Sequence, residues 1–497
     1  MLAKRILLSF SFFVLLILTP FFSARAEAAP AEEITGKCTL LLNGEAPSEE
    51  LRDARADTHQ ALEPGSELIL ESSKTIGGLY VKFSVSAPWT LRTAEGEERS
   101  CGENGFLHEF IGELNTKSLS LLFPEGCDLA QLKVYSPGEP PESVQRWEPC
   151  WERADVLFLP THSDDEQLYF AGLIPWCLSR GARVQVVYLI SHRDAEVRIH
   201  EALDGLWASG LRNYPVLGEF ADLGNLSYEQ TLGIYINRLQ NWETFEGRLV
   251  GLYRRFQPQV VVTHAQFGES GHGAHILNYM TSVAAAKLSN DASRYTESAE
   301  KYGTWEVPKL YVHSCRTNPV VLNFDQPLSL YGGRTAFQTA QDAFEFYPSQ
   351  HGWGYWDWLN SKPQASRLLP RPDQYGLYIS HVGDDEHTDT LFDHVVLYDE
   401  QDAVLRAEEE ARLAVEHELE AAAELRRERE EAKLREAAER EAQQAADEAA
   451  ERERQDKLAQ MRIIIIRVSA IVMLLGAGAV ALLMYNRKKS IDQEEDD

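Results

Sequence analysis

Four nearly continuous apolar runs, each followed by a stretch with helical character, constrain this fold most. The runs are residues 155–160, 183–191, 259–264 and 309–314. Runs without polar alternation suit strands buried on both faces, and strands that alternate with helices form a parallel sheet. We therefore expect a central α/β domain with a Rossmann-like parallel sheet over residues 154–398.

The segment before this domain has a different pattern. Between residues 34 and 150, short runs of alternating apolar and polar residues are separated by turn residues. This alternation is typical of a β-sandwich. It resembles the galactose-binding-like jelly rolls that are appended to surface enzymes. Two interpretations stay open for it, a spacer and a glycan-binding module.

Apolar segments near both termini predict export and anchoring. Residues 1–26 combine basic residues, an apolar core and small residues, which is typical of a signal peptide. Residues 463–485 are apolar and long enough for a single transmembrane helix. The basic residues that follow this helix would keep the tail, residues 486–497, in the cytoplasm. The sequence thus predicts a single-pass protein of the cell membrane with an extracellular body.

A charged segment separates the α/β domain from the predicted span. Residues 400–460 are rich in Ala, Glu and Arg and contain no Gly or Pro. This composition favours a long C-terminal helix that opposite charges at helical spacing stabilise. The leucines keep no heptad, so we interpret the segment as a solvated stalk. A weak coiled coil, through which copies of the chain self-associate, is the alternative.

Charge and cysteine content narrow the class of partner. The formal net charge of -29 disfavours a nucleic-acid partner, because phosphates repel an acidic surface. An exported body would permit disulfides among the six cysteines, and the sequence does not choose between the pairings. No two cysteines have CxxC spacing, so a cysteine metal site is not expected.

Residues suited to metal chemistry follow two of the apolar runs. His162, Asp164 and Asp165 follow the first run, and His272 and His275 follow the third. Ligands bind at the carboxyl ends of strands in an open parallel sheet, so the two groups can converge. Two imidazoles and a carboxylate suit Zn²⁺ and leave a position for water, whose proton a second carboxylate can accept. The pattern predicts a zinc-dependent hydrolase.

Three stretches in this order also carry a family resemblance. They read THSDDE at 161–166, RIHEALDGLWASGL at 198–211 and GESGHGAH at 268–275. Together they resemble the PIG-L/LmbE-like zinc-dependent de-N-acetylases, which are related to N-acetylglucosaminyl-phosphatidylinositol deacetylase. The resemblance implies a hydrolase of carbon–nitrogen bonds other than peptide bonds. Its substrate would be the acetamide of an N-acetylated amino sugar, glycan or glycoconjugate.

The resemblance also implies a role for individual residues. The family's metal ligands fall on His162, Asp165 and His275, its base on Asp164, and its oxyanion donor on His272. Its substrate-binding arginine falls on Arg198, which would either orient the substrate or pair with Glu201.

Two further residues are candidates for substrate binding. Asp194 stands where the family has a Gly-Glu pair and is its candidate substitute. His264 follows the third apolar run and is either a core histidine or a pocket residue. We assign no functional role to His192 or His313.

Two positions depart from the family pattern. Ser163 replaces a proline, which affects only the turn. Ala274 replaces an aspartate expected to support the histidines, so metal affinity is in question. The main hypothesis is a cell-surface zinc-dependent deacetylase. Its rivals are a catalytically inactive glycan-binding surface protein and a stalked scaffold that serves adhesion.

Overall fold

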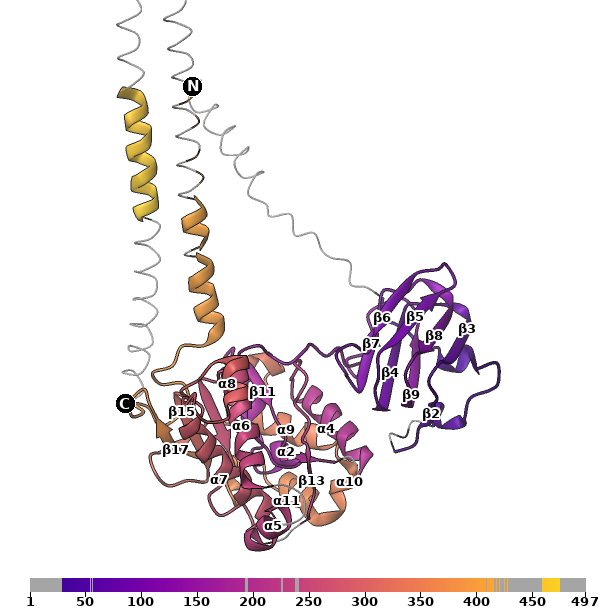
Figure 1. Cartoon of the computed structure of the whole chain (residues 1–497), viewed down its shortest axis with the longest axis horizontal. Coiled ribbons are helices and arrows are strands. Elements are labelled where there is room, and N and C mark those ends of the chain that lie inside the picture. The colour runs from indigo at the N-terminus through magenta and orange to yellow at the C-terminus, as the bar shows by residue number, and fades with distance from the viewer. Residues whose placement is uncertain are drawn as a thin grey trace, which may run out of the picture. The chain divides into compact units, whose positions relative to one another are not determined.

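Figure 1 shows a computed structural model of the chain, which divides into two compact units, Met1–Ala403 and Val404–Asp497. The structure describes residues 29–53, 55, 57–192, 195–224, 227–236, 241–407, 409–414, 417, 420, 424, 427 and 458–473. The first unit contains two sheets of a sandwich and a separate six-stranded sheet flanked by helices.

The sandwich consists of two antiparallel sheets with strand orders β1-β3-β8-β5-β6 and β2-β9-β4-β7. Along β3, Leu68 and Leu70 are buried and alternate with less buried neighbours, so one face of the strand packs into the core. The strands are β1 (Cys38–Leu42), β2 (Gln60–Leu62), β3 (Ser66–Ile76), β4 (Gly78–Val85), β5 (Trp89–Thr93), β6 (Glu98–Cys101), β7 (His108–Ile111), β8 (Thr116–Phe123) and β9 (Cys127–Tyr135).

The central sheet has the strand order β11-β10-β14-β15-β17-β16. The first four strands pair in parallel, and β17 pairs antiparallel with both β15 and β16. The sheet is therefore mixed, with antiparallel strands at one edge, as in many doubly wound folds. The strands are β10 (Val156–Phe158), β11 (Val184–Val186), β14 (Val260–Thr263), β15 (Lys309–His313), β16 (Pro319–Val321) and β17 (Gln374–Ser380), and β12 (Ile190–Ser191) pairs separately with β13 (Phe220–Ala221).

Helices cover both faces of the central sheet. Leu157, Val261 and Leu310 share one core cluster with side chains of α6 and α7. Phe158 and Val262 point the other way, into a cluster with α3, α4 and α9. The helices are α2 (Asp165–Leu168), α3 (Leu173–Leu178), α4 (Glu196–Ala208), α5 (Tyr228–Ile234), α6 (Trp242–Phe256), α7 (Gly273–Leu288), α8 (Thr296–Tyr302), α9 (Ala336–Phe344), α10 (Pro348–Gln350) and α11 (Trp356–Asn360).

Polar contacts join the sandwich to α4 within the first unit. Lys82 Nζ lies 3.0 Å from Asp204 Oδ1, and His108 Nε2 lies 2.7 Å from His200 Nδ1. Burial lowers the pKa of His200 to about 3, and it also lowers the pKa of His108. Both imidazoles are therefore neutral near pH 7, and the sandwich is held by a buried hydrogen bond as well as an ion pair.

The predicted fold class is wrong where it ends in a transmembrane helix. Among the described residues, no helix is both long and apolar enough to cross a membrane. The described part of the predicted span is residues 463–473. The structure supports a mixed α/β multidomain fold. The predictions of a single-pass cell-membrane protein and of a membrane partner depended on this helix, and they are overturned together with it.

Three other predictions about the termini and cysteines have different outcomes. The predicted signal peptide, residues 1–26, lies outside the described residues, as does the central part of the predicted stalk, residues 428–457. Self-association through the stalk stays a prediction. All six cysteines are free thiols, so none of the disulfides that export would permit is present.

Candidate metal centre

The pairing of two strands places the first predicted group, His162 to Asp165, beside the residues that follow the third apolar run. β10 and β14 are parallel neighbours, with Phe158 opposite Val262. The segments that leave these strands therefore start at the same edge of the sheet. The Thr161 backbone N–H donates to Asp165 Oδ2 at 3.0 Å and to His264 Nε2 at 2.9 Å.

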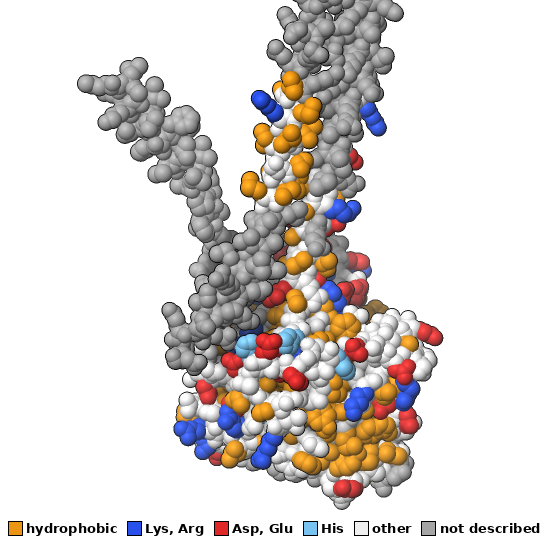
Figure 2. Space-filling view, turned by 90° about the vertical axis from the view of Figure 1, so that its left-hand side faces the viewer, with side chains coloured by type: hydrophobic (Ala, Val, Ile, Leu, Met, Phe, Trp, Pro, Cys, Tyr) orange, Lys and Arg blue, Asp and Glu red, His pale blue; other side chains and the backbone are white. Residues whose placement is uncertain are grey.

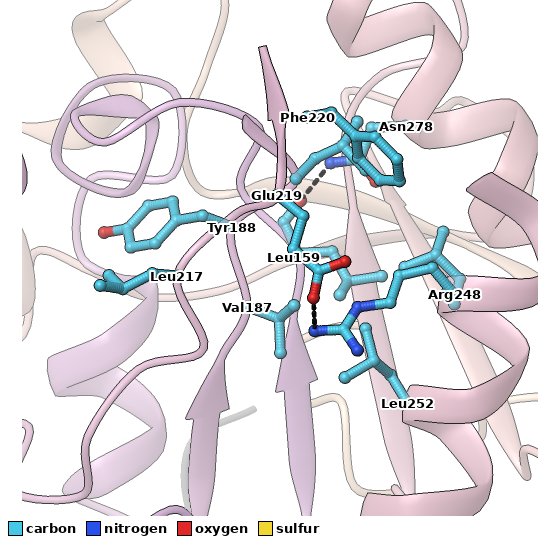
Figure 3. Close-up of a pocket in the computed structure, with 11 residues that line it drawn as sticks. Leu159, Val187, Tyr188, Leu217, Glu219, Phe220, Arg248, Leu252 and Asn278 are labelled. Carbon is cyan, nitrogen blue, oxygen red and sulfur yellow. Dashed lines mark hydrogen bonds and ion pairs between the residues drawn. The ribbon is translucent and has the colours of Figure 1, made fainter. Parts of the chain in front are cut away.

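Helix α7 brings the second group of histidines to the same place. His272 is the N-cap of α7, and its Nδ1 accepts the Ala274 N–H at 3.3 Å. One turn beyond His275, Asn278 Nδ2 donates to the Leu159 carbonyl oxygen at 3.0 Å, as Figure 3 shows. Asn278 thus fixes α7 against the segment that leads to the first group.

The three predicted metal ligands lie within contact distance of one another. His162 Nδ1 is 3.5 Å from Asp165 Oδ2 and 3.1 Å from His275 Nε2, and His275 Nε2 is 3.3 Å from Asp165 Oδ1. All three side chains are buried. His272 also lies close to His162 and His275. One ring nitrogen of each of these three histidines lies within 4.8 Å of the other two.

These separations are of the size that a small divalent cation requires. Atoms about 2.0–2.2 Å from a tetrahedral Zn²⁺ lie roughly 3.3–3.6 Å apart, and the observed distances are 3.1–3.5 Å. Asp165 faces His162 with Oδ2 and His275 with Oδ1. The sets in which one ligand atom of each residue lies within 4.8 Å of the others are His162, His272 and His275, and Asp165, His264 and His275. Burial disfavours the imidazolium of His275, but Asp165 and Glu269 raise its pKa to about 10. The buried carboxylates therefore favour a positive charge at this point, which a cation would supply.

Glu269 orients the histidines, and the sequence analysis gave it no role. Its Oε2 lies 2.6 Å from His275 Nδ1, so the imidazole donates there and its Nε2 faces Asp165 Oδ1 at 3.3 Å. Metal-binding histidines commonly donate their other N–H to a carboxylate in this way. His313, at the end of β15, lies with Nδ1 2.9 Å from Glu269 Oε1. Glu269 thus has the position from which a carboxylate can support His275, the support that we expected to be lost with Ala274.

Both ring nitrogens of His264 already have partners. Nε2 accepts the Thr161 N–H, so the proton is on Nδ1, which lies 2.9 Å from Glu269 Oε2. The side chain is fully buried. His264 Nε2 also lies 3.4 Å from Asp165 Oδ2, and His264 forms with Asp165 and His275 a set whose ligand atoms lie within 4.8 Å of one another. Of the two interpretations of His264, its burial favours the core histidine, and a role in substrate binding stays a prediction.

Asp164 lies beside the three-residue cluster and is held by Arg198. Arg198 Nη2 donates to Asp164 Oδ2 at 2.9 Å and to the Ser163 carbonyl oxygen at 3.0 Å. Burial raises the pKa of Asp164 to about 6, although the guanidinium of Arg198 opposes this shift. Glu201 does not pair with Arg198; it accepts the Ser349 N–H at 2.9 Å. A carboxylate with a raised pKa is suited to accept and return a proton near neutral pH.

Two residues that the sequence analysis did not select lie on the open side of the cluster. Asp222, just after β13, has Oδ1 3.6 Å from His162 Nε2 and Oδ2 3.7 Å from Arg198 Nη1. His192 accepts the Ser163 N–H at its Nε2, 3.2 Å away. Asp194 lies outside the described residues. Figure 2 shows one face of the molecule, on which a few histidine side chains lie next to acidic ones.

Comparison with known proteins identifies the family of this domain. Residues 157–286 match the PIG-L family, described as GlcNAc-PI de-N-acetylase. The chain therefore contains a PIG-L domain, and the predicted resemblance is confirmed.

Curated relatives share part of this domain. A 1D-myo-inositol 2-acetamido-2-deoxy-alpha-D-glucopyranoside deacetylase of Mycobacterium leprae is 30% identical over 183 residues, which cover 32% of this chain and 59% of the relative. The protein of the same name from Streptomyces avermitilis is 26% identical over 179 residues, covering 31% of this chain and 60% of the relative. The chain thus spans about three-fifths of the length of the curated relatives that it matches.

Among solved structures, similarity extends over less than half of the chain. The N,N'-diacetylchitobiose deacetylase from Pyrococcus horikoshii has a TM-score of 0.34 and 14% identity, covering 45% of this chain and 83% of that chain. A conserved protein from Thermus thermophilus has a TM-score of 0.33 and 17% identity, covering 47% of this chain and 97% of that chain. Overlaps this small do not bear on the fold.

Proposed function

We propose that the PIG-L domain is a metal-dependent amide hydrolase that removes acetyl from an N-acetylglucosamine-containing substrate. The observation that carries this proposal is the buried triangle of His162, Asp165 and His275, with Asp164 beside it. The family membership supports the reaction class, and the names of the relatives support a 2-acetamido sugar as the reacting group.

Zn²⁺ is the proposed cofactor. His162, Asp165 and His275 would hold it, since two neutral imidazoles and one carboxylate are a donor set that zinc sites commonly use. A bound zinc ion would polarise the acetamide carbonyl group and lower the pKa of a water molecule. The fully buried Glu269 would keep His275 in the tautomer that presents Nε2 to the ion.

The remaining residues supply proton transfer and charge stabilisation. Asp164, oriented by Arg198, would accept a proton from the water whose oxygen attacks the acetamide carbon. His272 Nδ1 accepts the Ala274 N–H, so its proton is on Nε2, which would donate to the oxyanion that develops on the carbonyl oxygen. When the carbon–nitrogen bond breaks, Asp164 would return its proton to the amine. The products are acetate and the free amino sugar.

The inactive glycan-binding alternative has lost the observation that favoured it. It depended on Ala274, which removes a carboxylate expected to support the metal-binding histidines. Glu269 contacts His275 Nδ1 at 2.6 Å and can perform that support. We therefore propose only the hydrolase.

Acetate release tests the proposal directly. The zinc-loaded full chain is expected to release acetate from N-acetylglucosamine oligomers. Asp164→Asn should lower kcat by about a hundredfold to ten-thousandfold, because the proton acceptor is lost. Asp384→Asn, which changes an exposed carboxylate outside the cluster, is the matched control. Absence of acetate from every N-acetylated sugar tested, or full activity in Asp164→Asn, would overturn the proposal.

A further inference from the structure

A cleft of about 500 Å³ lies between the sandwich and the α/β part of the first unit. Ser84, Val85 and Leu107 line it from the sandwich. Ser163 and His192 line it from the other side. Its volume is within the roughly 300–1,000 Å³ of ordinary ligand sites and exceeds what one acetamide group requires.

The two walls of the cleft are fixed to one another. The Leu107 N–H donates to the Tyr214 hydroxyl at 3.0 Å, directly beside the buried contact between His108 and His200. Because these bonds are buried and link both sides, the cleft has a defined width.

The cleft is adjacent to the candidate metal centre at Ser163 and His192. Ser163 stands between His162 and Asp164 in the chain, and its backbone is tied to both His192 and Arg198. A molecule whose acetamide lay at the three-residue cluster would therefore have the cleft beside it, across Ser163 and His192.

The chemistry of the lining selects for a neutral, hydroxyl-rich ligand. Ser163 is 3% exposed, and neither its hydroxyl nor that of Ser84 has a hydrogen-bond partner among the described residues. Buried hydroxyls normally have partners, so these two are available to a ligand. Val85 and Leu107 add apolar surface. None of the described lining residues is Lys or Arg, whereas two are carboxylates, Glu196 and Glu219, which argues against an anionic ligand. Both carboxylates already face a basic side chain, His59 at 3.4 Å and Arg248 at 2.7 Å, so a ligand need not be a cation.

We propose that this cleft binds the sugar units attached to the N-acetylated residue, so that the substrate is a neutral oligosaccharide and the sandwich is part of its binding site. This inference rests on the proposed function. It assigns the sandwich a role that neither a spacer nor an independent glycan-binding module would have, because the sandwich acts at the same substrate molecule as the cluster.

Blocking the sandwich wall tests the inference. Val85 is 50% exposed at the cleft, and Val396, outside the cleft lining, is 52% exposed. The measured quantity is kcat/KM for a β-1,4-linked N-acetylglucosamine tetramer divided by kcat/KM for the monomer. In the full chain, Val85→Trp should lower this ratio by about tenfold or more. Val396→Trp should keep the wild-type ratio. Zinc content checks the integrity of each variant.

The outcomes separate this inference from the proposed function. Acetate release with no preference for the tetramer, or an equal ratio in both variants, would overturn the cleft and leave the deacetylase. The opposite outcome is also possible to detect by calorimetry. If the protein releases no acetate but binds the tetramer, and Val85→Trp weakens this binding, the deacetylase is overturned and a saccharide site remains. Neither binding nor release would overturn both.

Discussion

Replacing Glu269 by Gln would test whether a buried carboxylate prepares the metal site. Glu269 Oε2 lies 2.6 Å from His275 Nδ1, and the side chain is fully buried. The amide has one acceptor oxygen and no charge, so it cannot accept from His264, His275 and His313 together, and the tautomer of His275 would be held less firmly. Loss of such a partner typically lowers metal affinity by about tenfold to a hundredfold. This change corresponds to about 1.4–2.7 kcal/mol of binding free energy.

The assay is zinc affinity, measured by competition with a chromogenic chelator. Glu139→Gln is the control, because Glu139 pairs with Arg146 at 3.1 Å on the surface of the sandwich. The control should bind zinc as the wild type does. An affinity of Glu269→Gln within about twofold of the wild type, in a protein that is still folded, would refute the role of Glu269.

Three further predictions follow from contacts around the site. Arg198→Met should lower kcat by about tenfold or more with zinc content unchanged, because it frees the Asp164 carboxylate; an unchanged kcat would count against the role of Arg198. Burial lowers the pKa of His200 to about 3, so the unfolded chain, with a pKa near 6.5, binds more protons between these values. Wild-type stability should therefore fall as the pH drops below about 6.5, and His200→Gln should flatten this dependence of the melting temperature; parallel pH profiles would contradict it. Asn278→Ala should lower the free energy of unfolding by about 1–3 kcal/mol in urea titrations, because it leaves the buried Leu159 carbonyl oxygen without this donor; a loss near zero would show that α7 is held by other contacts.

Much of the central sheet follows from local pattern. The run 155–160 contains β10, and the run 259–264 contains β14, because strands buried on both faces need uninterrupted apolar residues. The antiparallel strand β17 is different. Its pairing with β15 depends on a long connection, and local composition carries no information on strand direction.

The same rule that located the first histidines would have found His313. It stands at the end of β15, the neighbour of β14, and the sequence analysis set it aside. Glu269 lies between the two selected groups, and only its contacts reveal its role. Asp222 follows the two-residue strand β13, which is too short to leave a periodic signal. Its approach to His162 is a product of tertiary folding.

The contact between the sandwich and α4 had no sequence signal. Lys82 and Asp204 are separated by 122 residues, and each belongs to an amphipathic element that reads as ordinary surface. The transmembrane prediction failed for a related reason. Composition over residues 463–485 indicated an apolar span, whereas no helix among the described residues is both long and apolar enough to cross a membrane.

We propose that His162, Asp165 and His275 together hold one divalent cation. This is tested by elemental analysis of the purified full chain after equilibration with zinc and removal of free metal. We expect one zinc per chain in the wild type and its loss in His275→Ala. Asn290→Ala, which changes an exposed residue, should retain the zinc. A wild type without zinc, or a His275→Ala protein that keeps a full equivalent, would contradict it.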